Sequence, residues 1–496
     1  GWSPMVVGVF EREQSIALLC QRTGDAHRDA ADQIAEVLGD LPVAVTQVAA
    51  TARWGEYTLS GYLDRLSNHP LESSISRLEG DDYPDAVGVA LFMAYEQALE
   101  QLRTKHPQQE SIATSLLGIL SLLAASGVPT HWLSKLHDDS DAVRDTLSFL
   151  KRSSILQEST DGDKTIIHRL QGQVYRETYL SNQEKFSEAN TNTKTLLNEI
   201  DVDQLANFEQ QRQETRNLVE QVGTITSQDY SRPLFSDPDF AALLATTLRN
   251  ATDLGMPHLA IALTDSVTRV GDTLGPDHPS TLTARNNLAG AYQTAGRLDE
   301  AIPLYEQNLE DRTRILGPHH PDTLTARNNL AYAYHDAGRL NEAIPLHEQN
   351  LEDRTRILGP HYPDTLNSRN NLAGAYDDAG RLDDAIELFE QNLKDFENLL
   401  GPHHPHTLLS RNNLANAYQA AGRLNEAITL YEQTLEDRTR ILGPRHPDTL
   451  ISRDNLADAY RTAGRIEDAE KLFETPSDSE NEQDGTEEDP DQEAGD

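Results

Sequence analysis

Cysteine and long apolar runs are almost absent from this sequence. Among 496 residues Cys20 is the only cysteine, which excludes an intrachain disulfide and a cysteine-ligated metal cluster. The longest apolar stretch, "LLGILSLLAASGV" at 116–128, is too short to cross a bilayer and predicts a buried helix. The opening residues "GWSPMVVGVF" lack the basic start and apolar run of a secretory signal. We therefore expect a cytoplasmic protein without a membrane partner.

Positive charge is also scarce. The chain carries 81 Asp and Glu against 42 Lys and Arg, a formal net charge of −39. Such a field repels the phosphates of nucleic acid unless a basic patch overrides it, and no Lys or Arg run is present. We therefore expect no nucleic-acid partner. Residues 476–496 hold ten acidic residues and no basic one, which predicts a disordered tail.

A phosphate-binding loop is the third absence. A nucleoside triphosphate site of this type needs the sequence G-x-x-x-x-G-K-[ST] and a strand ending in acidic residues that hold Mg²⁺. Neither pattern occurs in the chain. As given, the chain should therefore have no catalytic residue, no ATPase activity and no cofactor.

An internal repeat dominates the second half of the sequence. The tripeptide "LGP" recurs every 42 residues, with its glycine at Gly275, Gly317, Gly359, Gly401 and Gly443. Each unit continues with HP-x-TL (YP-x-TL in the third unit), an amphipathic helix that ends near "AGR", and a second amphipathic helix. One helix pair cannot bury both apolar stripes, so neighbouring pairs must stack into a solenoid.

Local signals predict how each unit begins and ends. The first helix of a unit, here the A helix, should take its N-cap from Ser280, Asp322, Asp364 or Asp448. Pro303 and Pro345 fall within the second, or B, helix and predict a slight bend. Residues 238–275 read as a degenerate earlier unit, and the last unit stops near Phe473.

The repeat pattern "NLAGAY…G.L.EAI.LY" resembles the tetratricopeptide repeat, with Ala289, Tyr292, Gly296, Ala301 and Tyr305 at the key places. The spacing, "LGP.HP.TL" and "NNLA" are similar to the longer repeats of kinesin light chain and of many bacterial signalling ATPases. The resemblance covers residues 275–473 and implies an all-α superhelical solenoid that binds proteins. Arg285 and its counterparts, and Asn308, depart from the family pattern.

Residues 10–66 resemble the helical subdomain that follows the nucleotide-binding core of NB-ARC/STAND ATPases, and residues 85–180 resemble the winged helix after it. "LGDLPVAV" at 38–45 lies on that family's proline-containing segment, and "IIHRL" lies where the family has a phosphate-sensing histidine. The resemblance implies that Pro42 and His168 contact ADP or ATP only if a nucleotide-binding core is present in a longer protein. "SILQES", "DGD" and "KTIIHRL" also predict a β-hairpin with an Asp-Gly turn.

The resulting domain prediction has six parts, and the fold class is all-α with one small β-hairpin. The parts are a helical subdomain (1–70), a linker (71–84), a winged-helix-like domain (85–180), a helical connector (181–235), the repeats (236–475) and the acidic tail (476–496).

Paired amides mark the expected site. In the tetratricopeptide fold the A helices line a concave face, and an amide offers both donors and an acceptor to an extended peptide backbone. The alternative is that one Asn of each pair bonds across to the neighbouring helix. The amides expected in the groove are Asn286, Asn287, Asn328, Asn329, Asn370, Asn371, Asn412, Asn413 and Asn455.

The repeats also differ from one another at positions that would contact the side chains of a partner. Units 280–321 and 322–363 differ at only seven positions, three of which are Gly290/Tyr332, Gln293/His335 and Thr294/Asp336 on the predicted concave face. Asp377 and Asn416 occupy equivalent positions in later units. Five repeats stacked roughly 10 Å apart give a groove of about 50 Å, enough for about 15 extended residues. Asp336, Asp377, Asp378 and Asp458 favour a peptide with basic residues.

Two other residue sets have structural explanations. The loop histidines lie a repeat apart, too far to share a metal ion, so we expect turn and capping roles. The arginine ladder of Arg285, Arg327, Arg369, Arg411 and Arg453 could bind phosphate, but pairing with Asp or Glu between helices is the preferred interpretation.

Three functions follow as hypotheses. The first is an interaction scaffold that forms the regulatory half of a STAND ATPase and could also self-assemble. The second is an NTPase switch, if a phosphate-binding core precedes these residues. The third is a transcription regulator that uses the winged helix on DNA, which the charge disfavours.

Overall fold

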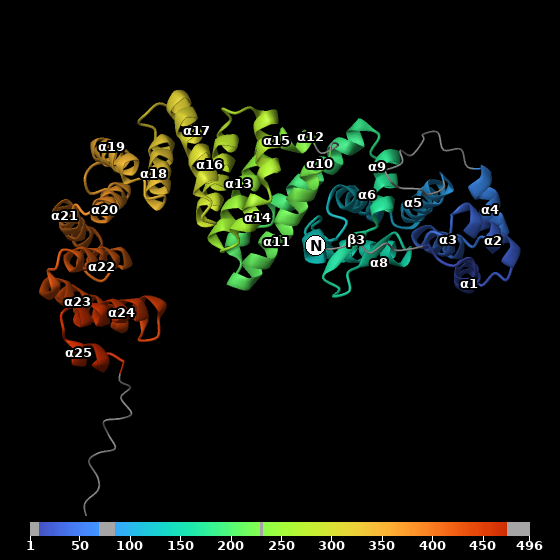
Figure 1. The fold of residues 1–496 in the computed structure, drawn as a ribbon. Helices are drawn as coiled ribbons and strands as arrows, with labels where there is room; N and C mark the ends of the chain where they lie inside the picture. Colours follow the sequence, from blue (N-terminus) through green and yellow to red (C-terminus); the bar gives the residue numbers. More distant parts are fainter. Residues whose placement is uncertain (1–8, 69–84, 229–231, 474–496) are drawn as a thin grey trace, which may run out of the picture. The chain divides into compact units, whose positions relative to one another are not determined.

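The computed structural model describes residues 9–68, 85–228 and 232–473 (Figure 1). It divides into two compact units, residues 1–297 and 298–496, which are described separately below. The predicted linker (71–84) and tail (476–496) lie outside the described residues, and the predicted domain boundaries stay predictions.

The first unit begins with four helices, as predicted for residues 10–66. They are α1 (Arg12–Thr23), α2 (Arg28–Val37), α3 (Pro42–Trp54) and α4 (Leu59–Asn68). Pro42 occupies the first turn of α3, where its missing N–H has no helical partner to lose. The Arg12 guanidinium pairs with the carboxylates of Asp40 and Asp32 at 3.0 and 3.1 Å and so fastens α1 to α2 and to the turn before α3.

A winged-helix arrangement follows. Its elements are α5 (Asp85–Lys105), α6 (Pro107–Leu122), β1 (Val128–Pro129), α7 (Thr130–Leu133), α8 (Ser140–Arg152), β2 (Leu156–Glu158), β3 (Lys164–Ile167) and α9 (Arg169–Thr178). The strands form an antiparallel sheet in the order β1-β3-β2, with Leu156 opposite Ile167 and Val128 opposite Thr165. The predicted hairpin is confirmed, and Gly162 supplies the positive φ (80°) of its turn. The apolar stretch at 116–122 lies in α6 and is buried there, as predicted.

Buried amides join the four-helix segment to the winged helix. The Gln171 Nε2 atom donates to Gln47 Oε1 at 2.8 Å and to the Ser154 carbonyl at 3.1 Å. The Gln47 Nε2 atom donates to the Ser153 carbonyl at 2.9 Å. Both glutamine side chains are buried, so these bonds replace water and fix α3 against α9.

The rest of the first unit is helical. It contains α10 (Gln183–Asn198), the 3₁₀ turn η1 (Val202–Gln204), α11 (Phe208–Thr226), α12 (Arg232–Phe235), α13 (Pro238–Asp253), α14 (Pro257–Ile261), α15 (Thr264–Leu274) and α16 (Pro279–Thr294). The predicted degenerate repeat is present as α13 followed by a second helix that is interrupted between α14 and α15.

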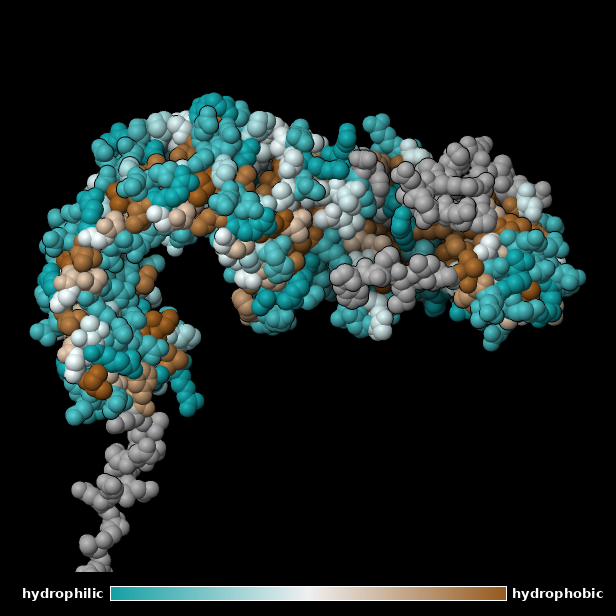
Figure 2. All heavy atoms as spheres, in the orientation of Figure 1, coloured by the Kyte–Doolittle hydropathy of each residue, from teal (hydrophilic) through white to brown (hydrophobic). Residues whose placement is uncertain are grey.

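The second unit consists of stacked helix pairs. Its B helices are α17 (Leu298–Leu316), α19 (Leu340–Leu358), α21 (Leu382–Leu400), α23 (Leu424–Leu442) and α25 (Ile466–Lys471). Its A helices are α18 (Pro321–Asp336), α20 (Pro363–Asp378), α22 (Pro405–Ala420) and α24 (Pro447–Thr462). The core combines small alanines with large side chains, such as Ala373 and Ala415 beside Phe389 and Tyr431. Pro303 and Pro345 lie within α17 and α19. Hydrophilic residues dominate the visible surface of these repeats (Figure 2).

The N-cap prediction for the A helices was wrong. The helices begin at a proline in the first helical position, so the caps are the residues before it: His278, His320, Tyr362, His404 and His446. The Nδ1 atom of His320 accepts a hydrogen bond from the Asp322 N–H at 3.2 Å, and His446 does the same for Asp448. Asp322, Asp364, Asp448 and Ser280 therefore lie inside the first turn. The capping role predicted for loop histidines is confirmed at four of the five caps.

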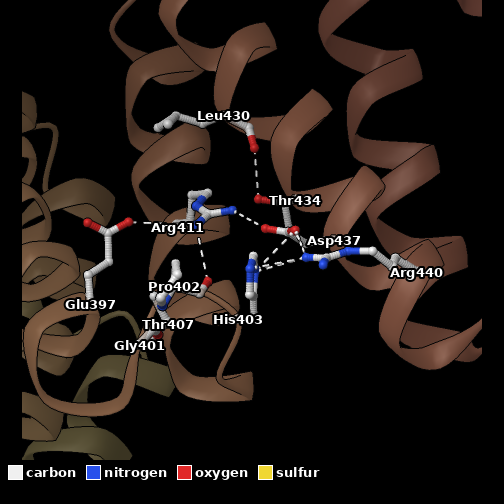
Figure 3. Close-up of polar contacts among 10 residues, drawn as sticks. All are labelled: Glu397, Gly401, Pro402, His403, Thr407, Arg411, Leu430, Thr434, Asp437 and Arg440. Atoms are coloured by element: carbon white, nitrogen blue, oxygen red, sulfur yellow. Dashed lines mark hydrogen bonds and ion pairs between the residues drawn. The ribbon is translucent and has the colours of Figure 1, made fainter.

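Three members of the arginine ladder, Arg327, Arg369 and Arg411, pair with aspartates between helices, as predicted, whereas the Arg453 guanidinium lies over the Phe473 ring, 4.9 Å from its centre. Arg411 binds the Asp437 carboxylate at 2.8 Å and the Pro402 carbonyl at 3.2 Å, and His403 and Arg440 bind the same carboxylate (Figure 3). Arg327 and Asp353 form the equivalent pair at 2.7 Å, with side chains only 9% and 3% exposed. Arg369 and Asp395 repeat the pair at 2.6 Å. Each of these three arginines thus closes its own A helix on the B helix that follows.

We expect the repeats to lose stability in acid through these aspartates. Burial alone would raise the pKa of Asp353 and Asp437, but hydrogen bonds from two arginines each outweigh it and lower the pKa below the ordinary 3.8. A lowered carboxyl pKa stabilises the fold above the unfolded-state pKa, and this stabilisation is lost as pH falls through the folded-state pKa. Denaturant titrations at stepped pH should show the free energy of unfolding falling below about pH 4. The Asp353→Asn variant should be less stable at neutral pH, and its free energy of unfolding should fall less on acidification. An unchanged fall would contradict the assignment.

Two buried amides in the B helices should lower the free energy of unfolding. Asn350 and Asn392 are completely buried, and within the described part of the chain neither amide atom of either side chain has a hydrogen-bond partner. Thr434 occupies the same position in the next repeat and satisfies its hydroxyl by donating to the Leu430 carbonyl at 2.7 Å. Because an unsatisfied buried polar group costs about 1–3 kcal/mol, Asn392→Thr should raise the free energy of unfolding by about that amount. The reverse change, Thr434→Asn, should lower it; the opposite signs would show that these amides are satisfied in solution.

Candidate functional site

The A helices of the second unit are tied together by the predicted asparagines. Asn371 Nδ2 donates to Asn328 Oδ1 at 3.1 Å, Asn413 to Asn370 at 3.0 Å, and Asn455 to Asn412 at 3.1 Å. The second amide of one repeat therefore bonds to the first amide of the repeat before it. We call the surface that carries this ladder the A-helix face; it corresponds to the predicted concave face.

The ladder gives the asparagines a structural role and leaves part of their hydrogen-bonding capacity unused. This is the alternative that the sequence left open, in which one Asn bonds across to the next helix. An amide has two N–H donors and an oxygen with two lone pairs, so each of these hydrogen bonds uses only part of its capacity. Five of the six asparagines are partly exposed, and Asn412 is buried, with 7% of its surface exposed. In the first unit Asn287 donates to the Ala245 carbonyl at 2.8 Å, and Asn286 lies beside it.

A pocket of about 350 Å³ opens on the A-helix face between α22 and α24. It is lined by Asn416, Gln419, Ala420, Tyr431, Asn455 and Asp458. Gln419 donates to the Asp458 carboxylate at 2.8 Å, and the Tyr431 hydroxyl donates to Asn416 Oδ1. Tyr431 comes from the B helix α23 and is 1% exposed, so it forms the floor. Asn416 and Asn455, two predicted site residues, are brought together here.

The variable positions predicted from the first two repeats also lie on this face. His335 on α18 contacts the Asp378 carboxylate on α20 at 2.5 Å, and its ring centre lies 6.1 Å from that of Tyr332. Tyr332 is 49% exposed although it is a large aromatic residue. Asp336 is exposed, and Asp377 is half-buried. These side chains differ from repeat to repeat while the backbone that carries them does not.

A constant frame surrounds the variable side chains. One tyrosine recurs near the end of each A helix of the second unit and donates its hydroxyl to a glutamate of the preceding B helix, as Tyr376 does to Glu348 at 2.7 Å and Tyr418 to Glu390 at 2.6 Å. An arginine covers each tyrosine ring, with the Arg381 guanidinium 3.8 Å from the ring centre of Tyr376. This frame ties each A helix to the B helix before it and is the same from repeat to repeat.

The residues that form the floor of the A-helix face were not predicted from the sequence. The residues equivalent to Tyr431 are Tyr305, His347 and Phe389, which lie on B helices and are nearly fully buried. Tyr305/His347 is one of the seven differences between the two most similar units, and this was the signal that could have identified the position. It was overlooked because only A-helix residues were expected to reach this surface.

The residues expected near a nucleotide lie at the starts of two helices that share a side-chain hydrogen bond. Pro42 opens α3, and His168 caps α9, where its Nδ1 atom accepts from the Leu170 N–H at 3.3 Å. Burial, with a smaller contribution from Arg169, lowers the pKa of His168. The Gln47–Gln171 bond joins these two helices.

Two negative observations apply to residues 9–68, 85–228 and 232–473 only. No three His, Cys, Asp or Glu side chains there are grouped so that they could hold a metal ion. No helix in the same ranges combines the length and apolar character that a bilayer span requires.

Comparison with known proteins identifies the repeats. Residues 251–475 match the family model for the tetratricopeptide repeat, in overlapping segments at 251–310, 280–349, 324–397, 378–438 and 406–475. No curated protein matches the chain.

Three solved structures illustrate the likeness. Kinesin light chain TPR-like repeats from Podosopora anserina are 33% identical over 41% of this chain and 97% of theirs, with a TM-score of 0.38. BtubC (BKLC) from P. vanneervenii is 19% identical over 51% and 96%, with a TM-score of 0.37. A STAND protein with a tetratricopeptide repeat sensor from Pyrococcus horikoshii is 15% identical over 94% and 65%, with a TM-score of 0.36.

Proposed function

This chain belongs to the tetratricopeptide-repeat family, whose repeats are scaffolds for protein–protein contacts, and we propose that its A-helix face binds a partner protein as an extended segment. The observation that carries the proposal is the 350 Å³ pocket among Asn416, Tyr431 and Asp458, set in a frame that is constant from repeat to repeat.

The chemistry of the face suits a polypeptide ligand. The amide ladder can donate to and accept from a peptide backbone, which gives affinity with little dependence on sequence. The variable residues Tyr332, His335, Asp377 and Asn416 would then read side chains. Because Asp336, Asp377, Asp378 and Asp458 gather on the same face, we propose that the segment contains Lys or Arg.

Selection from a random library of 15-residue peptides on the immobilised full chain tests the proposal. The expected result is a set of binders with a shared spacing of basic residues, displaced by one another in competition. Enrichment of no peptide, or of peptides that bind without mutual competition, would contradict a single binding face.

We also propose that the chain is the regulatory part of a STAND-type ATPase. Support comes from the order of the helical segment, winged helix and repeats, and from the buried Gln47–Gln171 bond that couples the first two. As an NTPase switch the protein would need a phosphate-binding core in addition to Pro42 and His168. Titration of the chain with a fluorescent ADP analogue should therefore show no saturable binding; saturable binding lost in His168→Ala would establish a nucleotide site within the chain itself.

DNA binding through the winged helix has weaker support. Three of its basic side chains are already paired with acids: Arg144 with Asp141 at 2.9 Å, Lys164 with Glu220 at 2.8 Å, and Lys151 with Glu158. Phosphate contacts would have to displace these pairs.

A further inference from the structure

Two large aliphatic residues, here called the aliphatic pair, are exposed on the A-helix face. Leu409 on α22 and Ile451 on α24 occupy the same position of consecutive repeats and are 48% and 52% exposed. The equivalent residues of the preceding repeats are polar and also exposed: Thr283, Thr325 and Asn367. The repeat fold therefore does not need an apolar side chain at this position. Contact with water costs these two side chains free energy that burial against a partner would recover.

The aliphatic pair lies in line with the amide ladder and the pocket. At about 3.6 residues per turn, Leu409, Asn413 and Asn416 fall within about 60° of one another around the α22 axis. Helix α24 repeats this spacing with Ile451, Asn455 and Asp458. At about 1.5 Å of rise per residue, Leu409 lies about 6 Å before Asn413 along the axis, and Asn416 lies about 5 Å beyond it. The ladder therefore runs between the aliphatic pair and the pocket.

The two sides of the ladder differ in polarity. On the pocket side, the exposed Asp458 carboxylate accepts a hydrogen bond at 2.8 Å from the Gln419 amide. Because this amide is neutral, the hydrogen bond leaves the negative charge of Asp458 in place. On the other side, the aliphatic pair offers no hydrogen-bonding group. The pocket side thus suits a cation, and the opposite side suits a hydrocarbon side chain.

An extended polypeptide has the periodicity that both sides require. Its successive side chains point in opposite directions, whereas a helix presents residues three and four apart on one face. Asn413 and Asn455 are partly exposed, so a backbone can lie along the ladder and bond to their amides. Side chains of such a segment alternate between the aliphatic pair and the pocket.

We propose that the partner segment places one large apolar side chain on Leu409 and Ile451 and one Lys or Arg side chain in the pocket beside Asp458. The two residues are an odd number of positions apart, because they point to opposite sides of the ladder. The inference rests on the proposed function of the A-helix face and adds an apolar determinant to it. Since the earlier repeats are polar at this position, the aliphatic pair also sets the register of the segment along the repeats.

Paired substitutions in peptide and protein test this arrangement. The probe is the tightest 15-residue peptide from the random library, with each large apolar residue replaced in turn by Ser and each Lys or Arg by Gln. Affinities are measured on the full-length wild type, Leu409→Thr/Ile451→Thr and Asp458→Asn. Threonine already occupies this position in two sister repeats, so the fold accommodates it. The matched control is Leu399→Thr/Ile441→Thr, which changes two aliphatic residues of similar exposure on the B helices α21 and α23.

At one apolar position of the peptide, replacement by Ser should weaken binding to the wild type and to the control at least tenfold, which is about 1.4 kcal/mol. The same replacement should have little effect on Leu409→Thr/Ile451→Thr, because the contact is already lost there. One basic position should behave in the same way toward Asp458→Asn, and it should lie an odd number of residues from the apolar position.

Three results would overturn this arrangement and leave the proposed function standing. They are equal sensitivity of Leu409→Thr/Ile451→Thr and the control, the lack of a sensitive apolar position, and an even separation between the two positions. A library that yields no binder would overturn the proposed function and, with it, the arrangement.

Discussion

Arg327→Ala should lower the free energy of unfolding of the repeats by about 3–5 kcal/mol, the loss typical when one member of a buried ion pair is removed. The remaining carboxylate of Asp353 is 3% exposed and would be left in a medium that solvates it poorly. Arg356 and His319 also contact Asp353, but both are at least half exposed and bind its other oxygen. The pair also closes α18 on α19, so its loss should loosen the neighbouring repeats.

Chemical denaturation followed by circular dichroism measures this effect. The double variant Arg327→Ala/Asp353→Asn is the informative control, because it removes the charge that the single variant strands in the interior. It should recover part of the lost stability. If the double variant is less stable than Arg327→Ala alone, the stranded charge is not the cause. If Arg327→Ala changes the stability by less than about 1 kcal/mol, the pair behaves as a surface salt bridge.

Asp378→Arg combined with Asp458→Arg should reduce the affinity for basic peptides by about 100-fold, because placing like charges against each other costs several kcal/mol. Both aspartates are exposed on A helices, where Asp378 contacts His335 and Asp458 contacts Gln419 of the preceding repeat. The free energy of unfolding should change by less than about 1 kcal/mol, as for other exposed positions.

The matched control is Asp383→Arg combined with Glu387→Arg, which makes the same change in net charge on exposed positions of the B helix α21. Fluorescence anisotropy with the library-selected peptide measures both pairs. Equal losses in the two double variants would indicate a general effect of net charge. Unchanged affinity after reversal on the A helices would exclude this face as the binding surface.

The parts of the fold that follow from spacing were predictable. The 42-residue period fixes which residues face one another, so the helix pairs and the pairing of Arg327, Arg369 and Arg411 with aspartates followed from position alone. The hairpin turn at Gly162 was equally clear, because glycine accepts the positive φ of that turn at low cost. The two-residue strand β1 was not foreseen, since two residues carry no alternating pattern.

The site was less predictable, because the sequence does not show which neighbouring group each side chain contacts. Aspartate and serine are the usual helix caps, but the proline of each A helix moved the cap to the preceding residue, where His320 and His446 accept through a ring nitrogen. The asparagines could have faced a ligand or a neighbouring helix, and the sequence does not show that Asn371 reaches Asn328. His347 belongs to a B helix, yet its burial places it at the floor of the A-helix face.

The most direct test of binding on the A-helix face is site-specific photo-crosslinking. A benzoylphenylalanine is placed at Asn416 in one protein and at Glu387 in another, and each full-length protein is irradiated with the library-selected peptide. Binding on the A-helix face predicts a peptide adduct at position 416 and none at position 387. An adduct at position 387 alone, or equal adducts at both positions, would contradict it.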